Sequence, residues 1–503
     1  MAFREEGIGS SRLSSEKSDM SHNDQLNIDP PPNLDAEFIF DADLERRITW
    51  KCDLKLLPPL IVLFVVTFID RTNIANAKIE GMTTELKMKN NDYNMSLWIL
   101  NIPYICLALP SNMLMKKEFV KPAVYLSGQM FCWSLCTIGL GLTRTFKGVL
   151  VCRFLMGCFE AGFVPGCAYL ISRYYKRRDF TVRYALFFSA SVLAGAFGGL
   201  LAFAIQNMKG VGGYSGWRWI FIIEGLVTVV TTVLGLFCIP DYPEKSTFLK
   251  LDEKKYLLDM LKIDAGPSRP DHYNFTVMRE CLSDPKIWLG TISYFGADTA
   301  ASSIVSFQPT ILNGLGYSSA QAQVHTIPVY IVALILFNIT SYISGKIRHR
   351  YSFLVFAAIL GIIGWSVELA VPITSIGARY FGMFAITACA YIQMPILVVW
   401  ISNNMGGNAK AAFATGFVIG FGNCGNLVSS NVFITNQAPG FRTGFGTGLA
   451  LTVVGLLSST FMEIWLFVKN RRRDAGREDG KLDENRYIVG DLGDDHPGFR
   501  YIL

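Results

Sequence analysis

Long apolar segments dominate this chain and limit what it can fold into. About twelve of them reach the roughly 20 residues that a membrane-spanning helix needs. Only 17% of the 503 residues are charged, whereas soluble domains carry about 25%. We therefore expect an all-α polytopic membrane protein with about twelve transmembrane helices. The segments cover approximately residues 54–78, 94–115, 121–142, 147–172, 182–207, 217–239, 286–312, 322–345, 351–372, 378–402, 411–435 and 445–469.

A polar stretch rich in Lys, Glu, Asp and Pro divides these segments into two groups of six. It predicts six-helix bundles at residues 50–240 and 286–470, joined by a linker at 241–285. Residues 1–49 are rich in Ser, Asp and Glu, so we expect a disordered tail, and residues 471–503 form a second tail. Clusters of Lys and Arg place both tails and the linker in the cytoplasm by the positive-inside rule. The clearest clusters lie at residues 173–178, 346–350 and 471–473.

Two bundles of six helices are typical of transporters that bind their substrate near the bilayer midplane. A channel would repeat a short pore loop with charges of one sign, and no such repeat is seen. No Walker A sequence is present, which argues against ATP-driven pumping, and no enzyme signature is found. The eleven cysteines show neither metal nor disulfide spacing. We expect no metal, no cofactor and no nucleic-acid partner, and a monomer driven by a proton gradient.

Four charged residues interrupt two of the apolar segments. Asp70 and Arg71 lie in the first segment, and Arg153 and Glu160 lie in the fourth. Each such charge costs about 2.5 to 3.5 kcal/mol at bilayer depth, so they usually face a cavity and mark a substrate or proton path. Arg153 and Glu160 are seven residues apart, which places them on one helix face about 10 Å apart. Antiparallel helix directions bring Asp70, Arg71 and Glu160 within about 5 Å of one another in depth.

Two interpretations of these charges are open. In the first, each arginine neutralises a carboxylate and fixes the first helix to the fourth. In the second, the arginines bind an anionic substrate, because a planar guanidinium suits carboxylate recognition, and the carboxylates hold the coupling proton. We favour the second, because four ionisable groups at this depth exceed what packing requires.

Other polar residues in the apolar segments are weaker candidates. Asp298, in the seventh segment, could face the cavity. A further group could bind substrate or bond neighbouring helices: Tyr294, Gln393, Asn403, Asn404, Asn423 and Asn426. Glu224 is expected to support structure or gating. Asn94 is the one glycosylation sequence that the topology places outside the cell, and its closeness to the membrane argues against a glycan.

Motifs from about residue 45 onward resemble the anion:cation symporter branch of the major facilitator superfamily, above all fungal allantoate and nicotinate permeases. They read FIDRTNIANAKIEGM, LPSNMLMKK, RFLMGCFEAGFVPG, GWRWIFIIEG, IPDYPE, SFQPTIL, WISNNMGG and GDDHPGFRYIL. The resemblance implies two six-helix bundles around a central cavity with alternating access, and a small organic anion as substrate. It also implies proton coupling at Asp70 and Glu160, with Arg71 as the primary carboxylate ligand and Arg153 as a supporting one.

Two departures from the family pattern concern gating and direction. The loop KKEFVKPAV lacks the fuller glycine-aspartate-arginine gating pattern of many members. Gly195 is followed by Ala196, where proton-antiporting drug exporters typically have Gly-Pro. We expect a proton-coupled importer of a small carboxylate, such as nicotinate, in the plasma membrane. Its partners would be that anion, protons and the lipid bilayer. An exporter of an acidic metabolite and a transport-inactive nutrient sensor remain the alternatives.

Overall fold

The computed structural model describes residues 41–477 apart from 90, 116–119, 207, 209, 266–274, 348 and 407, together with 494 and 499–503. Met1–Asp43 and Leu44–Leu503 form separate contact units, and the arrangement described here is that of the second. Its described residues fold into α-helices and short 3-10 helices without a β-strand, which confirms the predicted all-α class. The tail expected at residues 1–49 lies mostly outside the described residues, although α1 already begins at Ala42.

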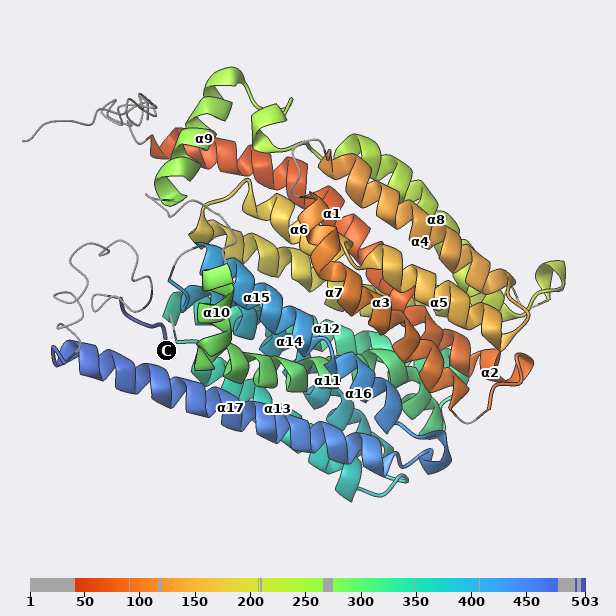
Figure 1. The fold of residues 1–503 in the computed structure, drawn as a ribbon. Helices are drawn as coiled ribbons and strands as arrows, with labels where there is room; N and C mark the ends of the chain where they lie inside the picture. Colours follow the sequence, from red (N-terminus) through yellow and green to blue (C-terminus); the bar gives the residue numbers. More distant parts are fainter. Residues whose placement is uncertain are drawn as a thin grey trace, which may run out of the picture. The chain divides into compact units, whose positions relative to one another are not determined.

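The first six apolar segments become seven helices, because the fourth segment is broken at Ala161 and Gly162 (Figure 1). We call this group the N bundle. Its helices are α1 (Ala42–Ile79), α3 (Asp92–Met115), α4 (Pro122–Leu142), α5 (Phe146–Glu160), α6 (Phe163–Ser172), α7 (Arg177–Gln206) and α8 (Gly216–Cys238).

The last six segments also become seven helices, because the eleventh is broken at Asn423 and Cys424. We call this group the C bundle. Its helices are α11 (Pro285–Gly314), α12 (Ser319–Ile347), α13 (Tyr351–Ala370), α14 (Ile376–Asn403), α15 (Asn408–Gly422), α16 (Gly425–Val432) and α17 (Arg442–Asp474).

Short helices lie in the connections between these long ones. The linker between the bundles contains three of them, η2, α9 and α10, which were not expected from its polar composition. The short helices are α2 (Met82–Glu85), η1 (Val211–Gly213), η2 (Pro243–Lys245), α9 (Leu251–Ala265), α10 (Phe275–Ser283) and η3 (Thr435–Gln437).

Nine helical stretches in the described part of the chain are long and apolar enough to cross a membrane. They account for nine of the twelve segments predicted from the sequence, with α5 and α6 counted as one. The other three segments correspond to α3, α11 and the α15–α16 pair. Each of these three contributes a polar side chain to the site described below, namely Asn101, Asp298 and Asn426.

Two helix pairs form the main contacts between the bundles. Within each bundle the helices pack on one another, for example α4 on α8 and α13 on α14 and α17. Between the bundles, α7 lies against α12, and α3 lies against α16. Glycines make the first of these contacts close: a Cβ atom on Gly195 would lie 2.5 Å from the Tyr330 ring, and one on Gly199 would lie 2.8 Å from the Gln323 carbonyl oxygen. Small residues thus let the helices of the two bundles approach closely.

The bundles are also joined by polar and aromatic contacts at one end. We call the end that carries α2 and η3 the α2 end, and the opposite end, where α1 begins and α17 ends, the terminus end (Figure 1). At the α2 end, the Tyr93 hydroxyl donates to the Ser306 carbonyl oxygen at 3.0 Å, and Asn94 Nδ2 donates to the Phe433 carbonyl oxygen at 3.4 Å. The Tyr93 ring also packs edge-on against the Phe307 ring of the C bundle, with centroids 5.9 Å apart. This end is therefore held together.

Candidate functional site

Arg71 is the partly accessible cation of the candidate site. Its Nη1 donates to Glu160 Oε1 at 3.3 Å, and its Nη2 donates to Asn101 Oδ1 at 3.0 Å. The guanidinium carbon lies 5.2 Å from the centroid of the Tyr104 ring. The Arg71 side chain is nevertheless 20% exposed, while that of Glu160 is 6% exposed. These two hydrogen bonds use two of the five guanidinium N–H groups, so the guanidinium keeps donors that a bound anion could engage.

The break between α5 and α6 positions Glu160, which is the last residue of α5. A Cβ atom on Gly162 would lie 1.8 Å from Ser111 Oγ on α3. Only a residue without a side chain fits there, so α3 packs directly against the break. The sequence places Arg71 and Glu160 at similar depth, and the structure brings them into an ion pair.

Asp70 lies beside Arg71 in sequence but bonds elsewhere. Its Oδ2 accepts from Trp133 Nε1 and from Thr228 Oγ1, both at 2.9 Å. Its Oδ1 is buried and has no hydrogen-bond partner, and the residue is only 1% exposed. Similar depth therefore does not bring Asp70 into contact with the Arg71–Glu160 pair. Successive residues on an α-helix point about 100° apart, so Asp70 faces α4 and α8 while Arg71 faces α3 and α5.

Glu224 joins Asp70 on that side of α1. Its Oε2 accepts a hydrogen bond from Asn73, and its Oε1 is buried without a partner. Thr228 lies between the Asp70 carboxylate and the Glu224 backbone, because its hydroxyl contacts both Asp70 Oδ2 and, at 2.8 Å, the Glu224 backbone carbonyl oxygen. The sequence predicted a role in structure or gating for Glu224. The structure places Glu224 among the buried acidic groups of the N bundle.

Arg153 lies on α5 and is 2% exposed. Its Nε is buried without a hydrogen-bond partner. Glu160 and Arg71 lie within electrostatic range of it, so it belongs to the same electrostatic environment as Arg71. Its side chain is much less accessible than that of Arg71, and direct contact with a substrate would need a rearrangement.

The C bundle contributes Asp298 and its neighbours. Asp298 Oδ2 accepts from Asn426 Nδ2 at 2.9 Å, and Asn426 Oδ1 accepts from the Ser302 hydroxyl. Asn426 lies in the first turn of α16, directly after the break in the eleventh segment. Tyr294 packs at the same break, because a Cβ atom on Gly422 would lie 2.2 Å from its ring. The structure thus brings together three predicted site residues at the second broken helix.

Site residues of the two bundles lie within electrostatic range of each other. The charges of Arg71 and Asp298 act on one another, although they belong to different bundles. Tyr391 of α14 also lies within electrostatic range of Arg71, and its hydroxyl is buried without a hydrogen-bond partner. An anion bound at Arg71 would therefore lie within electrostatic range of groups from both bundles, as expected of a site near the midplane between them.

Three other predicted residues lie in different surroundings. Gln393 is buried on α14. Asn403 is the last residue of α14, about 15 Å further along the axis than Gln393 at the usual helical rise, so it lies at the terminus end. Asn94 is 1% exposed, and its amide bonds across the bundle interface. A buried amide is not accessible for glycosylation, and Asn94 is a contact residue of the α2 end.

Sequence reasoning missed several residues of the site. Asn101 and Tyr104 in the second segment contact Arg71, and Asn101 could have been found as an amide within an apolar run. Trp133 and Thr228 hold Asp70, but their residue types are common in membrane helices and gave no signal. Tyr391 also gave none, because its position depends on the rotation of α14.

No metal centre is found in the described part of the chain, where no group of three or more His, Cys, Asp or Glu residues could hold an ion. The site therefore consists of arginines, carboxylates, amides and phenols at two broken helices.

Comparison with known proteins identifies the family. The sequence model described as Major Facilitator Superfamily matches residues 60–428, which is more than half of the chain. The chain belongs to the Major Facilitator Superfamily. It is accordingly a multi-pass membrane transporter, and the twelve-helix fold predicted from the sequence agrees with this family.

Individual relatives of this superfamily cover nearly the whole chain. An uncharacterised transporter of Schizosaccharomyces pombe is 31% identical over 93% of this chain and 92% of its own length. The high-affinity nicotinic acid transporter of Saccharomyces cerevisiae is 26% identical over 91% of this chain and 85% of its own length. Among solved structures, the D-xylose-proton symporter matches with a TM-score of 0.60 and 15% identity, over 82% of this chain and 97% of that one. At that identity the likeness concerns the fold alone.

Proposed function

We propose that this major facilitator is a proton-coupled symporter of a small organic anion that works by alternating access. The observation that carries the proposal is the position of Arg71. Its partly exposed guanidinium pairs with Glu160 of the N bundle and lies within electrostatic range of Asp298 of the C bundle. A planar guanidinium can bind a carboxylate through two parallel hydrogen bonds, so Arg71 is the proposed ligand of the anion.

Glu160 is the proposed coupling group. A substrate carboxylate that binds the remaining donors of Arg71 competes with Glu160 for the positive charge of the guanidinium. Once Glu160 loses its cation, burial favours its neutral form, and it takes up a proton. Substrate and proton then cross together, and loss of the substrate restores the ion pair.

Asp70 is the proposed second proton site. Among the described residues it is bonded only to the neutral donors Trp133 and Thr228, and one of its oxygens has no partner there. The number of protons determines how the membrane potential acts. One proton with a monoanion moves no net charge, whereas a second proton adds about 2.3 kcal/mol of driving force per 100 mV.

The proposed substrate class is a small monocarboxylate, with nicotinate as the first compound to test. This choice rests on the chemistry of Arg71 and on the relative named as a nicotinic acid transporter. The buried phenol of Tyr391 and the ring of Tyr104 near Arg71 would suit an aromatic acid. We place the protein in the plasma membrane. The distribution of Lys and Arg supports a cytoplasmic location for both termini.

Uptake of radiolabelled nicotinate into proteoliposomes tests the proposal. We expect accumulation when the outside is acidic and none when the pH gradient is abolished with an ionophore. A potassium diffusion potential, negative inside, should raise accumulation further if both Asp70 and Glu160 carry protons. Uptake that ignores the pH gradient would contradict proton coupling. A panel of allantoate, pantothenate and aromatic acids identifies the substrate if nicotinate is not taken up.

A further inference from the structure

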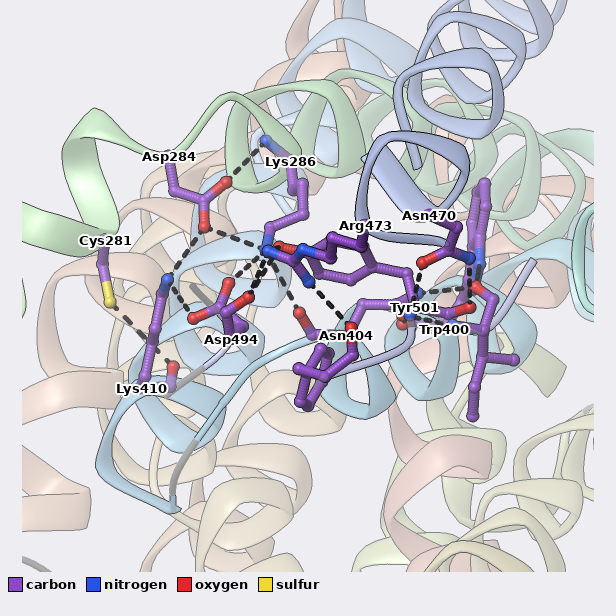
Figure 2. Close-up of polar contacts among 12 residues, drawn as sticks. Cys281, Asp284, Lys286, Trp400, Asn404, Lys410, Asn470, Arg473, Asp494 and Tyr501 are labelled. Carbon is purple, nitrogen blue, oxygen red and sulfur yellow. Dashed lines mark hydrogen bonds and ion pairs between the residues drawn. The ribbon is translucent and has the colours of Figure 1, made fainter. Parts of the chain in front are cut away.

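A segment of the C-terminal tail is docked onto the terminus end of the C bundle (Figure 2). We call Asp494 together with residues 499–503 the tail segment. The Asp494 carboxylate lies between two lysines: Oδ2 pairs with Lys286 of α11, and Oδ1 pairs with Lys410 of α15 at 2.7 Å. Asp284, the N-cap residue of α11, lies 3.3 Å from Lys286 Nζ and 3.0 Å from Lys410 Nζ. Two lysines and two carboxylates thus form a neutral quartet.

Side-chain amides hold the backbone of the tail segment. Asn470 of α17 donates to the Tyr501 carbonyl oxygen and accepts from the Tyr501 amide, both at 2.9 Å. Asn404, next to the end of α14, holds Ile502 in the same way, at 2.9 Å and 2.8 Å. Trp400 Nε1 also donates to the Ile502 carbonyl oxygen at 2.9 Å. Paired donor and acceptor bonds of this kind capture an extended chain as a neighbouring strand would.

Arg473 of α17 provides a third buried cation beneath the tail segment. Its guanidinium donates to the carbonyl oxygens of Asp494 and Phe499, both at 2.9 Å. It also lies 4.7 Å from the centroid of the Tyr501 ring. Tyr501 is 5% exposed, and its hydroxyl donates to the Asp494 carbonyl oxygen at 3.0 Å. The two parts of the tail segment are therefore bonded to each other as well as to the bundle.

Removal of the tail segment would leave the cations poorly compensated. Lys286 is 1% exposed and Arg473 is 3% exposed. Without Asp494, Lys286 and Lys410 would share the single carboxylate of Asp284. A buried cation that loses its partner is strongly destabilising, so the tail segment contributes to the stability of this end of the C bundle.

The tail segment ties down the connection between α14 and α15. Asn404 lies just before this connection and Lys410 lies just after it, and both bind the tail segment. The same segment is fastened to α11 through Lys286 and to α17 through Asn470 and Arg473. At its far side, α15 contacts α3 of the N bundle. In this structure the bundles are bonded at the α2 end. In alternating access, closure of one end accompanies opening of the other, which here is the terminus end.

We propose that the tail segment is an intramolecular latch. When docked, it holds the α14–α15 connection against α11 and α17, and so favours the state in which the α2 end is closed. When released, it lets α14 and α15 move toward the N bundle and close the terminus end. The proposal rests on the alternating access of the Major Facilitator Superfamily and is independent of which anion is carried.

Cys281 is a native reporter of the latch. It is fully buried on α10, and its sulfur lies 4.0 Å from the Lys410 carbonyl oxygen. Burial raises the pKa of the Cys281 thiol to about 11, with a smaller opposing effect of Lys410. The protected thiol should therefore react slowly with a maleimide while the tail segment is docked, because the thiolate is the reactive form.

The test uses the full-length protein in nanodiscs, with maleimide labelling of each cysteine followed by mass spectrometry. D494N and N470A should each raise the labelling rate of Cys281 by about tenfold or more, since loss of a partner exposes a buried ion network. D494E should leave the rate nearly unchanged. R500A is the matched control, because Arg500 lies in the same segment but pairs with Asp474 at the surface.

A second cysteine tests the conformational part of the proposal. S306C places a thiol at the closed α2 end, where the Ser306 carbonyl oxygen accepts from Tyr93. In the D494N background its labelling should rise, because the population with an open α2 end increases. If Cys281 labelling rises but S306C labelling does not, the tail segment is a local support and the latch is wrong. If neither rate changes, the docked tail segment has no role in stability or switching. Because labelling needs no substrate, these outcomes leave the proposed anion transport untouched.

Discussion

Asp70 and Arg71 are consecutive in sequence, yet their side chains bond to different helices. Arg71 Nη1 donates to Glu160 Oε1 of α5 at 3.3 Å, whereas Asp70 Oδ2 accepts from Trp133 Nε1 of α4 at 2.9 Å. The Arg71 side chain is partly exposed, whereas Asp70 is buried. The two residues therefore mark two sides of α1, one accessible to a substrate and one buried. Replacement of each residue should have a different effect.

Replacement of Glu160 should uncouple transport from the proton. E160Q keeps a side chain that can still accept from Arg71 but cannot release a proton. We expect loss of pH-driven nicotinate accumulation, with exchange of labelled for unlabelled substrate retained. E463Q, a change in α17 outside the site, is the control. Full pH-driven accumulation in E160Q would remove Glu160 from the coupling role.

Replacement of Arg71 should weaken substrate binding. R71K keeps the charge but loses the two parallel donors that fit a carboxylate. The apparent KM for the anion should rise by roughly tenfold, as expected for the loss of one hydrogen bond to a charged group. R183K is the matched control, because Arg183 forms a comparable two-donor pair with Asp53 away from the site. Equal KM values for R71K and the parent would show that Arg71 pairs with Glu160 and does not bind the substrate.

The hydrogen bond from Trp133 to Asp70 should contribute to stability. W133F removes a donor from a buried carboxylate and should lower the free energy of unfolding by about 1 to 3 kcal/mol. W288F is the control, because the Trp288 indole bonds to a backbone carbonyl on an exposed surface. Thermal unfolding in the same detergent compares the two. An equal loss of stability in both variants would contradict a special role for the Asp70 contact.

The close contact of α7 with α12 should be sensitive to one added methyl group. In G199A the new Cβ atom would lie 2.8 Å from the Gln323 carbonyl oxygen, so the bundles must separate locally. Such overpacking typically costs about 1 to 3 kcal/mol. We expect slower uptake and faster labelling of S306C. G416A and G420A provide controls, since nothing lies within 4 Å of their added Cβ atoms.

The latch should remain docked through the physiological pH range. Burial alone would raise the pKa of Asp494, but its ion pairs with Lys286 and Lys410 outweigh this and lower the pKa below its usual value. A lowered pKa stabilises docking above the pKa of the free residue, about 3.9, and this stabilisation is lost only as the pH falls through the lower, docked value. Cys281 labelling, corrected for the reactivity of a free thiol, should stay constant from about pH 8 to pH 5. A marked rise on mild acidification would instead identify a titrating group near neutrality.

The sequence alone predicted the fold class and singled out the charged residues of the N bundle, because apolar length and intramembrane charge are strong signals. Arg71 and Glu160 could be matched in depth from helix direction and rise. The separation of Asp70 from Arg71 required the rotation of α1 about its axis, and that rotation depends on packing against Trp133 and Thr228. The breaks at Ala161 and Asn423 were not predicted, because the apolar pattern continues through both.

The docked tail could not be predicted for a different reason. Its contacts are made mainly by the backbone, as with Tyr501 and Ile502, so the side-chain pattern carries little information. The lysines that receive Asp494 resemble ordinary positive residues at the ends of transmembrane helices. Lys286 is 208 positions away from its partner, and only tertiary structure reveals the pairing.

That separation also orders the assembly of the protein. During synthesis Lys286 and Lys410 enter the folding C bundle long before Asp494 exists. Until the last part of the chain is made, this end of the bundle carries buried cations with half of their neutralising carboxylates. The tail therefore completes this ion network late in synthesis. The transporter reaches its full stability only after the ribosome has passed residue 494, and products that end before this residue keep buried cations without enough neutralising carboxylates.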